Sequence, residues 1–438
     1  MIDNDSIPPT ADASSSRRLR LGIDDFTYAD LYEPARLIEL AEAFYQELAR
    51  ADADLWLEFS RYLNARGKGF GERDESNLLV RVAPHLGSFL ARLFGVEDER
   101  NVLIAKAQAE AVIFEFKKVC IQRRIRKMDA EEVLKAVARF QQLEDKVWEL
   151  KKLHLEQSSL DADEELATAR LWRAVNQNPT ELEQLEKWLA ALAVVAPNRI
   201  RNWSSWRQPQ MLDYSHLVQI ERPRGDLPEL MTGPDFRLRR RDGFSLTDPR
   251  FTPREVLDEI HYCIYCHERD KDTCSKGFVE KDGSYRQNPL GIPLVGCPLD
   301  EKISEAHTVR RDGDALGALA LIMIDNPMCP GTGHRICNDC MKACIFQKQD
   351  PVNIPQIETG ILTDVLEMPW GVEVYALLTR WNPLNVERPC ALAYNGKKVL
   401  GRYGTRRLYA CSSPAQRRLR RYRDRRSQDR APLGGTCR

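Results

Sequence analysis

The sequence lacks any apolar stretch that could span a bilayer. Its longest uncharged apolar run, from Ala315 to Ile324, falls far short of the roughly 20 residues that a membrane helix needs. The polar segment from Met1 to Gly22 also lacks the apolar core of a secretory signal. We therefore expect a cytoplasmic protein with no membrane partner, and a disordered leader over residues 1–25.

Positive charge is scarce outside the C-terminus. The 438-residue chain has a net charge of zero, but Gly401 to Arg438 contains twelve Arg and two Asp, with no Lys or Glu. The remaining residues, Met1 to Leu400, carry 53 basic and 63 acidic side chains. A protein that binds nucleic acid needs a basic surface to neutralise phosphates, so this acidic body argues against nucleic acid as a partner.

The first half of the chain has a helical pattern almost throughout, and no internal repeat is present. Between Asp129 and Leu153 apolar residues recur at three- and four-residue steps, which predicts one amphipathic helix. A similar pattern from Val102 to Val119 predicts a second helix that packs against the first as an antiparallel hairpin. We expect the isolated Cys120 to be a buried core thiol. Together these patterns predict a helical domain over residues 26–197.

The composition changes after Pro197, where prolines recur and helical periodicity disappears. Trp203 and Trp206 alternate here with arginines, a pattern that could stack nucleic-acid bases. In an acidic body we instead expect these tryptophans to attach a linker, residues 198–250, to the helical domain. Beyond the linker, a capping box and a first-turn proline predict the start of a helix at Thr252, Pro253 and Glu255.

Eight of the chain's twelve cysteines lie within 82 residues. They include two Cys-x2-Cys pairs and two Cys-Pro steps, and they are Cys263, Cys266, Cys274, Cys297, Cys329, Cys337, Cys340 and Cys344. In a reducing compartment such a group is expected to bind metal and not to form disulfides. A Cys-x2-Cys turn points two sulfurs and nearby backbone N–H groups toward one cluster. The spacing therefore predicts two [4Fe–4S] clusters.

Two structural zinc sites are the main alternative, because eight cysteines can also form two tetrahedra of four thiolates. Zinc modules more often contain two separated Cys-x2-Cys pairs per ion, whereas here one pair is followed by a lone cysteine. A zinc-binding helical scaffold without redox activity therefore stays open as an alternative function. Four histidines near the block are expected to lie beside the ligands or on the surface: His261, His267, His307 and His334.

The cysteine block resembles the N-terminal iron–sulfur domain shared by the small subunit of glutamate synthase and by dihydropyrimidine dehydrogenase. The likeness covers roughly residues 252–400 and rests on the Cys-Pro-Leu step that ends at Leu299, a helix from Asp314 to Asp325, and the exit segment 351–358. It implies a helical two-cluster module over residues 251–360. It also implies that one cluster is held by Cys263, Cys266, Cys274 and Cys344. The other would be held by Cys297, Cys329, Cys337 and Cys340.

The resemblance further implies an electron-transfer module of a flavin- and NAD(P)-dependent oxidoreductase, without a catalytic side chain of its own and with a redox partner protein or subunit. Residues 361–400 would lead into an FAD domain, but its glycine loop is absent. Permitted codons for Gly401 to Cys411, read one base later, can spell V-G-M-G-P-A-G-Y-T-L, which contains a G-x-G-x-x-G fingerprint. We therefore interpret residues 401–438 as a non-native, out-of-frame tail. FAD and NAD(P)H are expected only in an intact full-length form.

Overall fold

The computed structural model describes residues 19–160, 162–218, 220–233, 243, 249–269 and 271–387. These residues are mainly α-helical and contain isolated β-bridges but no extended strand. The prediction of a mainly helical chain is therefore confirmed. Across the same described ranges, no helix is both long and apolar enough to cross a membrane.

Three predicted segments lie wholly or partly outside the described residues. The tail at 401–438 is wholly outside, and so are residues 388–400 of the segment that would lead to a flavin domain. Of the predicted leader, only residues 19–25 are described. They form a turn beside the end of a helix, where the Gly22 N–H donates to the Leu93 carbonyl oxygen at 2.9 Å.

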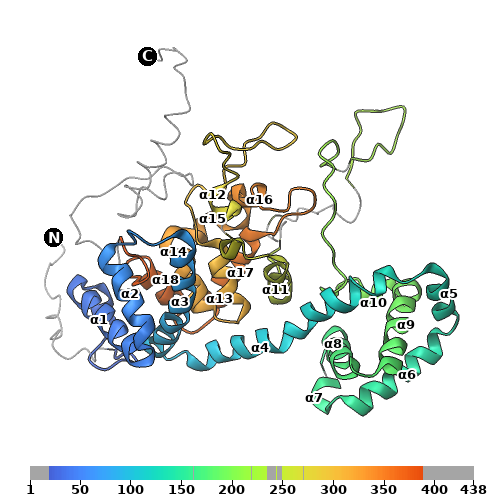
Figure 1. Cartoon of the computed structure of the whole chain (residues 1–438), viewed down its shortest axis with the longest axis horizontal. Helices are drawn as coiled ribbons and strands as arrows, with labels where there is room; N and C mark the ends of the chain where they lie inside the picture. Colours follow the sequence, from blue (N-terminus) through green and yellow to red (C-terminus); the bar gives the residue numbers. More distant parts are fainter. Residues whose placement is uncertain are drawn as a thin grey trace, which may run out of the picture.

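One long helix, α4 (Glu97–Phe116), joins two groups of helices (Figure 1). The central body contains α1 (Pro34–Ala51), α2 (Ala53–Ala65), α3 (Glu72–Phe94), α11 (Pro253–Tyr262), α12 (Thr273–Lys276), α13 (Ile303–Arg311), α14 (Ala315–Asp325), α15 (Cys329–Ile336), α16 (Asp339–Lys342), α17 (Ile354–Leu366) and α18 (Gly371–Leu378). The peripheral module contains α5 (Ala130–Ala138), α6 (Phe140–His154), α7 (Gln157–Leu160), α8 (Glu164–Val175), α9 (Pro179–Val195) and α10 (Pro197–Ile200). The short 3-10 or π turns are η1 (Tyr28–Tyr32), η2 (Lys117–Ile121), η3 (Ile125–Lys127) and η5 (Cys266–Arg269).

Helix α14 lies at the centre of the central body, and every residue in it is buried. It matches the helix expected from its apolar run, with Asp314 as the N-cap residue. Two glycines allow it to approach α3 closely. A Cβ on Gly317 would lie 2.7 Å from the Ala83 carbonyl oxygen, and a Cβ on Gly87 would lie 2.5 Å from an Asp314 carboxylate oxygen. A side chain at either position would collide with these atoms, so the two glycines allow the close crossing of α3 and α14.

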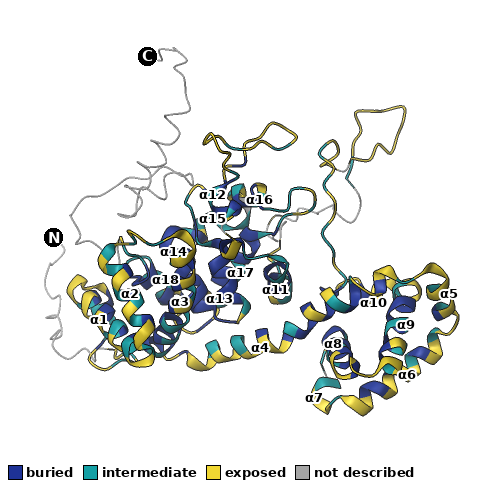
Figure 2. Ribbon diagram, viewed as in Figure 1, coloured by how far each residue is buried: buried dark blue, intermediate teal, exposed yellow. Residues whose placement is uncertain are grey.

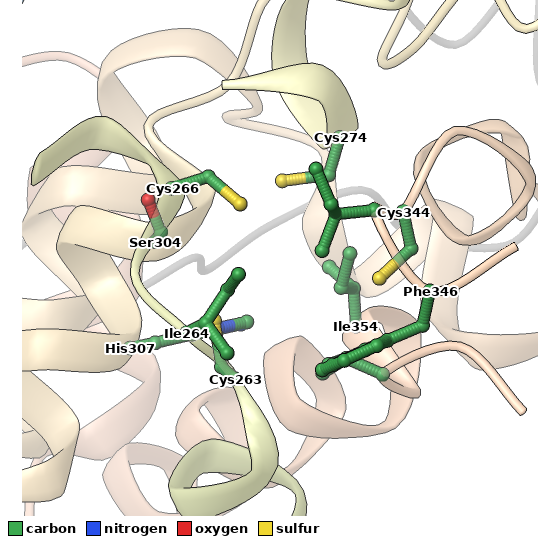
Figure 3. A pocket seen from close by; sticks show the side chains of 11 residues that line it. Cys263, Ile264, Cys266, Cys274, Ser304, His307, Cys344, Phe346 and Ile354 are labelled. Atoms are coloured by element: carbon green, nitrogen blue, oxygen red, sulfur yellow. The ribbon is translucent and has the colours of Figure 1, made fainter. Parts of the chain in front are cut away.

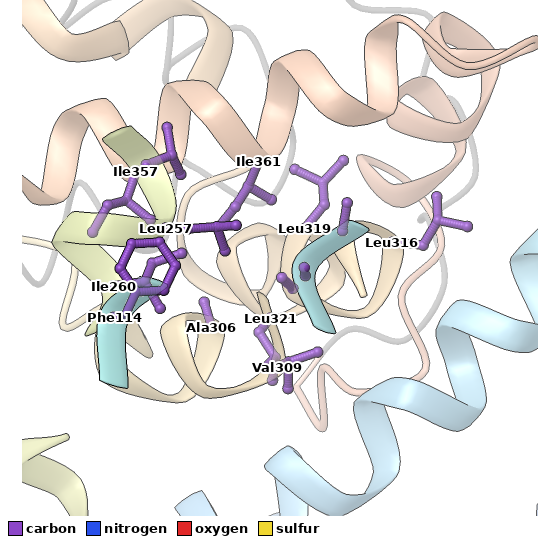
Figure 4. Close-up of a cluster of buried hydrophobic side chains, with 14 of the residues drawn as sticks. Phe114, Leu257, Ile260, Ala306, Val309, Leu316, Leu319, Leu321, Ile357 and Ile361 are labelled. Carbon is purple, nitrogen blue, oxygen red and sulfur yellow. The ribbon is translucent and has the colours of Figure 1, made fainter. Parts of the chain in front are cut away.

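A layer of apolar side chains connects α11, α13, α14 and α17 (Figure 4). The second half of α4 reaches into this layer, where Phe114 lies beside Leu257 and Ile260. The Phe114 ring also stacks on His261 of α11, with ring centroids 4.3 Å apart. Because these side chains are buried, removal of their apolar surface from water stabilises the helices from which the cysteine loops extend.

The single helix predicted between Asp129 and Leu153 is wrong. The structure divides it into α5 and α6 at Arg139, where φ is −113° and ψ is 17°. The predicted hairpin is also wrong, because α4 packs mainly on α8 and Val102 is 64% exposed. Figure 2 shows that the first half of α4 is largely exposed between the two groups of helices. The break at Arg139 lets both α5 and α6 pack on α9, which the local periodicity could not indicate.

The two tryptophans do attach the start of the linker to the helices, as expected. Trp203 is buried, and the Arg126 guanidinium lies over the Trp206 ring, 5.9 Å from its centroid. A nitrogen of the same guanidinium donates to the Trp206 carbonyl oxygen at 2.8 Å. Further along, residues 210–212 run antiparallel to residues 348–350. The linker is therefore held at both the helical region and the segment that follows the last cysteine of the block.

Candidate functional site

All eight cysteines of the block lie in the described residues and are free thiols. We call Cys263, Cys266, Cys274 and Cys344 the first thiol group. We call Cys297, Cys329, Cys337 and Cys340 the second thiol group. Most of them lie at helix ends or in short turns, where the chain changes direction and a side chain can face a common centre.

The first thiol group lines one small cavity in the central body (Figure 3). Its four cysteines come from the end of α11 with η5, from α12, and from the segment after α16. Apolar side chains complete the wall, among them Ile264, Phe346 and Ile354. The free space at the centre is about 10 Å³, which is roughly the volume of one water-sized sphere. The fold thus brings four distant thiols together in a tightly packed, largely apolar place.

The Cys-x2-Cys turn of the first group follows directly from α11. This helix begins at the predicted capping box and ends at Cys263. Tyr265 then adopts a left-handed conformation, with φ at 53°, and its N–H donates to the Cys263 sulfur at 3.4 Å. Such a conformation is strained for a residue other than glycine. The Tyr265 hydroxyl donates to the Ile260 carbonyl oxygen at 3.0 Å and helps to hold the turn.

Burial raises the pKa values of the first-group thiols. It raises the pKa of Cys263 to about 12 and that of Cys266 to about 11. Burial also raises the pKa of Cys274 well above its usual value. At Cys344, burial raises the pKa, and hydrogen bonds from the backbone N–H groups of Phe346, Val352 and Ile345 oppose this increase. These groups are therefore neutral thiols at physiological pH, and a bound metal cation would release their protons.

His307 of α13 is one of the four histidines named from the sequence, but the sequence did not distinguish it from the other three. It lines the same cavity, it is 1% exposed, and neither ring nitrogen has a hydrogen-bond partner in the part of the chain that the structure describes. Burial lowers its pKa to about 3, so the ring is neutral and offers one donor and one acceptor. Ser304, three residues earlier, lines the cavity too. This spacing on one helix face is a signal that could have identified the pair.

The other three histidines have contacts elsewhere. His261 stacks on Phe114, as described above. The Nδ1 atom of His267 lies 2.6 Å from the Ser304 hydroxyl, and the Nδ1 atom of His334 lies 3.4 Å from the Thr359 hydroxyl. His267 does not line the first cavity itself and contacts its wall through Ser304.

The second thiol group lies near two carboxyl groups, that of Glu301, which is buried, and that of Glu358, which is partly buried. Burial raises the pKa values of both, and it raises that of Glu301 well above its usual range. The charge of Glu358 and a hydrogen bond between the two side chains add to the increase in the pKa of Glu301. Burial is also the main cause of the raised pKa values of the second-group thiols. The charge of Glu301 or Glu358 adds to the increase at Cys297, Cys329, Cys337 and Cys340.

A backbone crossing joins the two groups. The Cys297 N–H donates to the Cys274 carbonyl oxygen at 2.9 Å, so one member of each group is fixed beside the other. Gly277 and Gly296 have φ angles of 84° and 73°, in the left-handed region that favours glycine. A Cβ on Gly296 would also lie 2.4 Å from the Gly277 nitrogen. The crossing therefore depends on glycine for both conformation and space.

Within the described ranges, no group of three or more His, Cys, Asp or Glu side chains is arranged to hold a metal ion. A tetrahedral zinc site needs four donors at roughly 2.0–2.3 Å from one ion. The thiols as placed do not provide this geometry.

Comparison with known proteins gives two similar curated sequences and one family model. Residues 21–95, which include α1 to α3, match the model described as RP005 N-terminal alpha-helical domain. Uncharacterized protein RP006 of Rickettsia prowazekii (strain Madrid E) is 68% identical over 62 residues, which are 14% of this chain and 9% of RP006. Uncharacterized protein RP005 of the same organism is 28% identical over 310 residues, which are 67% of this chain and 98% of RP005. No solved structure matches.

These findings correct the predicted family and function. The predicted resemblance to glutamate synthase and dihydropyrimidine dehydrogenase is wrong. The family model that matches describes an RP005 domain, and the two similar proteins, RP005 and RP006, are uncharacterized. The predicted iron–sulfur electron-transfer module of a flavin- and NAD(P)-dependent oxidoreductase is wrong on the same findings. The alternative function, a zinc-binding helical scaffold, is also wrong, because the described residues contain no group arranged to hold a metal ion. The cofactor and the ligand role of the cysteines are separate predictions that these findings do not test.

Proposed function

We propose that this chain binds a thiolate-liganded metal cofactor in each thiol group. The observation that carries the proposal is that three separate segments place Cys263, Cys266, Cys274 and Cys344 around one cavity. Where thiols are kept reduced, four converging cysteines are not explained by disulfides. Thiolates are, however, the preferred ligands of soft metals and metal–sulfur clusters.

Within this proposal, the specific cofactor is one [4Fe–4S] cluster per thiol group. A cluster is larger than a single ion, so its four ligands stand further apart than the ligands of one zinc ion. Backbone N–H groups that donate to the sulfurs of Cys263 and Cys344 support this choice, because such hydrogen bonds stabilise the charge of a thiolate cluster. FAD and NAD(P)H form no part of the proposal for this chain.

The unpartnered imidazole of His307 gives independent support. Buried polar groups are nearly always hydrogen-bonded, and this ring has no partner for either nitrogen among the described residues. A group bound at the centre of the cavity could accept its N–H. The proposal also places the protein in the cytoplasm, because eight thiols must stay reduced to bind metal. It needs neither a nucleic acid nor a membrane.

Metal and sulfide analysis of the full chain, purified without oxygen, tests the proposal. We expect about four iron atoms and four acid-labile sulfides for each thiol group. Cys274→Ala should remove the iron and the sulfide that the first group binds, and leave those of the second group. Cys120→Ala is the matched control, because Cys120 is also a buried thiol but belongs to neither group. Zinc without sulfide would refute the clusters, and a protein with no bound metal would refute the whole proposal.

A further inference from the structure

The peripheral module contains a cavity of its own, between α6, α7, α8, α9 and α10. Its volume is about 210 Å³. For comparison, an engineered apolar cavity of roughly 150 Å³ binds benzene. Its apolar wall is formed by Trp148, Trp188, Val147, Leu160, Ala162 and Ala167. The space and its lining therefore suit a ligand with a single ring.

Lys151 of α6 supplies a positive charge to this cavity. It lines the cavity although the residue is only 7% exposed, and its ammonium lies 5.5 Å from the centroid of the Trp188 ring. The ammonium forms no ion pair with a carboxylate in the described part of the chain. A lysine is seldom buried unless it is paired, because its charge is then poorly solvated. The contact with the Trp188 ring compensates only part of this cost.

The other charged groups of the cavity are two carboxylates, Glu144 and Glu164, and one guanidinium, Arg199. A nitrogen of Arg199 donates to Glu144 at 2.9 Å, and the same guanidinium also pairs with Glu164. The second oxygen of Glu144 accepts from the Trp188 indole N–H at 2.6 Å. Both carboxylates attract Lys151 electrostatically, but their direct ion pairs are with Arg199, so among the described residues the Lys151 ammonium has no carboxylate in direct contact.

We propose that this cavity binds a small ring-shaped carboxylate. The ring packs against the two tryptophans and displaces water from the apolar wall, which favours binding. The carboxylate of the ligand supplies the direct contact with the Lys151 ammonium that the described residues do not make, and such charge-assisted hydrogen bonds are the stronger kind. This inference goes beyond the cofactor proposal and does not depend on the thiol groups.

Titration of the full chain with phenylacetate, followed by tryptophan fluorescence and ligand-observed NMR, tests the proposal. We expect saturable binding below about 10 mM. Phenylethanol has the same ring but no charge, and we expect it to bind at least about tenfold more weakly. This comparison uses the unmodified protein, so it does not depend on the folding of a variant. Equal binding of the two molecules, or no binding of phenylacetate, would overturn the proposal.

Two lysine variants locate the site. Lys151→Met is expected to weaken phenylacetate binding by at least about tenfold, because it keeps the length of the side chain and removes the charge. Lys152→Met is the matched control, since Lys152 is the next residue on α6 and lies over Trp148 but does not line the cavity. We expect its affinity to stay within about twofold of the unmodified protein. An equal loss in the two variants would contradict a site at Lys151.

Discussion

The two thiol groups contain the same ligands in different surroundings. The first lines an apolar cavity with a neutral imidazole and backbone N–H donors, and one carboxyl group, that of Asp272, accepts a hydrogen bond from the Cys274 thiol at 3.3 Å. The second lies near the carboxyl pair of Glu301 and Glu358, whose charge adds to the raised pKa values of its thiols. A metal centre with four thiolate ligands is itself negative, so nearby carboxylates disfavour it. We therefore expect the first group to bind its cofactor more tightly than the second, although the cysteine count is equal.

Gly296→Val should remove the difference in cofactor affinity between the two thiol groups, because it disrupts both. Valine would be strained at a φ of 73°, and its Cβ would collide with the backbone at Gly277. We expect a loss of about 3 kcal/mol or more in the free energy of unfolding, since steric and conformational strain add. We also expect loss of metal from both groups, as measured by elemental analysis and denaturant unfolding.

Gly291→Val is the control for this change. Gly291 has the same φ of 73°, but the nearest atom to its Cβ position is the Gln287 side-chain oxygen at 3.8 Å. The control should therefore carry the conformational strain alone, about 1–2 kcal/mol, and keep its metal. If the two variants lose metal equally, the crossing at Gly296 does not hold the groups together.

Phe346→Ala should affect the first group alone. The Phe346 ring lines the first cavity and stacks on Tyr262, with ring centroids 4.4 Å apart. We expect a loss of about 2–3 kcal/mol in unfolding free energy and release of metal from the first group, while the second group keeps its metal. Phe278→Ala removes a ring that packs against Arg286 outside both groups, and it should release no metal. Equal release from the two groups would show that their cofactors are not held independently.

Glu301→Gln tests the electrostatics of the second group. Burial raises the folded-state pKa of Glu301 well above its usual 4.5, so the native state keeps a proton that the unfolded chain releases. The unmodified protein therefore loses stability as the pH rises from about 4.5 through the folded-state pKa. Glutamine does not ionise, so the variant should be the more stable at pH 7, and this gain should vanish below about pH 4. Denaturant titrations between about pH 4 and pH 7 measure the difference in unfolding free energy between the two proteins. A gain that does not depend on pH would show that the substitution acts through side-chain packing and not through ionisation.

Thr252→Ala should give the smallest effect, again on the first group. Thr252 is the N-cap of α11, the helix that ends at Cys263. Loss of such a cap costs about 1 kcal/mol. Hydrogen exchange should show faster opening of α11, whereas α15 and α16 of the second group should keep their protection. Unchanged exchange in α11 would show that tertiary packing, not the cap, sets its stability.

Local patterns were sufficient where a feature depends on neighbouring residues. The capping box at Thr252, the helix after Asp314 and the N–H bond to the Cys263 sulfur each involve residues only a few positions apart. The local patterns failed where packing between distant segments decides the position of a helix end or the burial of a side chain. The break at Arg139 follows from contacts with α9, and no local periodicity shows them. The same holds for Lys151, whose charge on an amphipathic helix indicates a solvent-exposed position rather than a cavity.

By itself, the sequence determined the helical class, the number of available thiols and the turn that links Cys263 to Cys266, because these depend on composition and short-range hydrogen bonds. Only the tertiary structure decided what surrounds the thiols: His307 lines the cavity of the first group, and the Glu301 and Glu358 pair lies near the second group. The physical reason is that burial sets the pKa of a thiol, an imidazole or a carboxyl group, and burial arises from packing between segments that lie far apart along the chain.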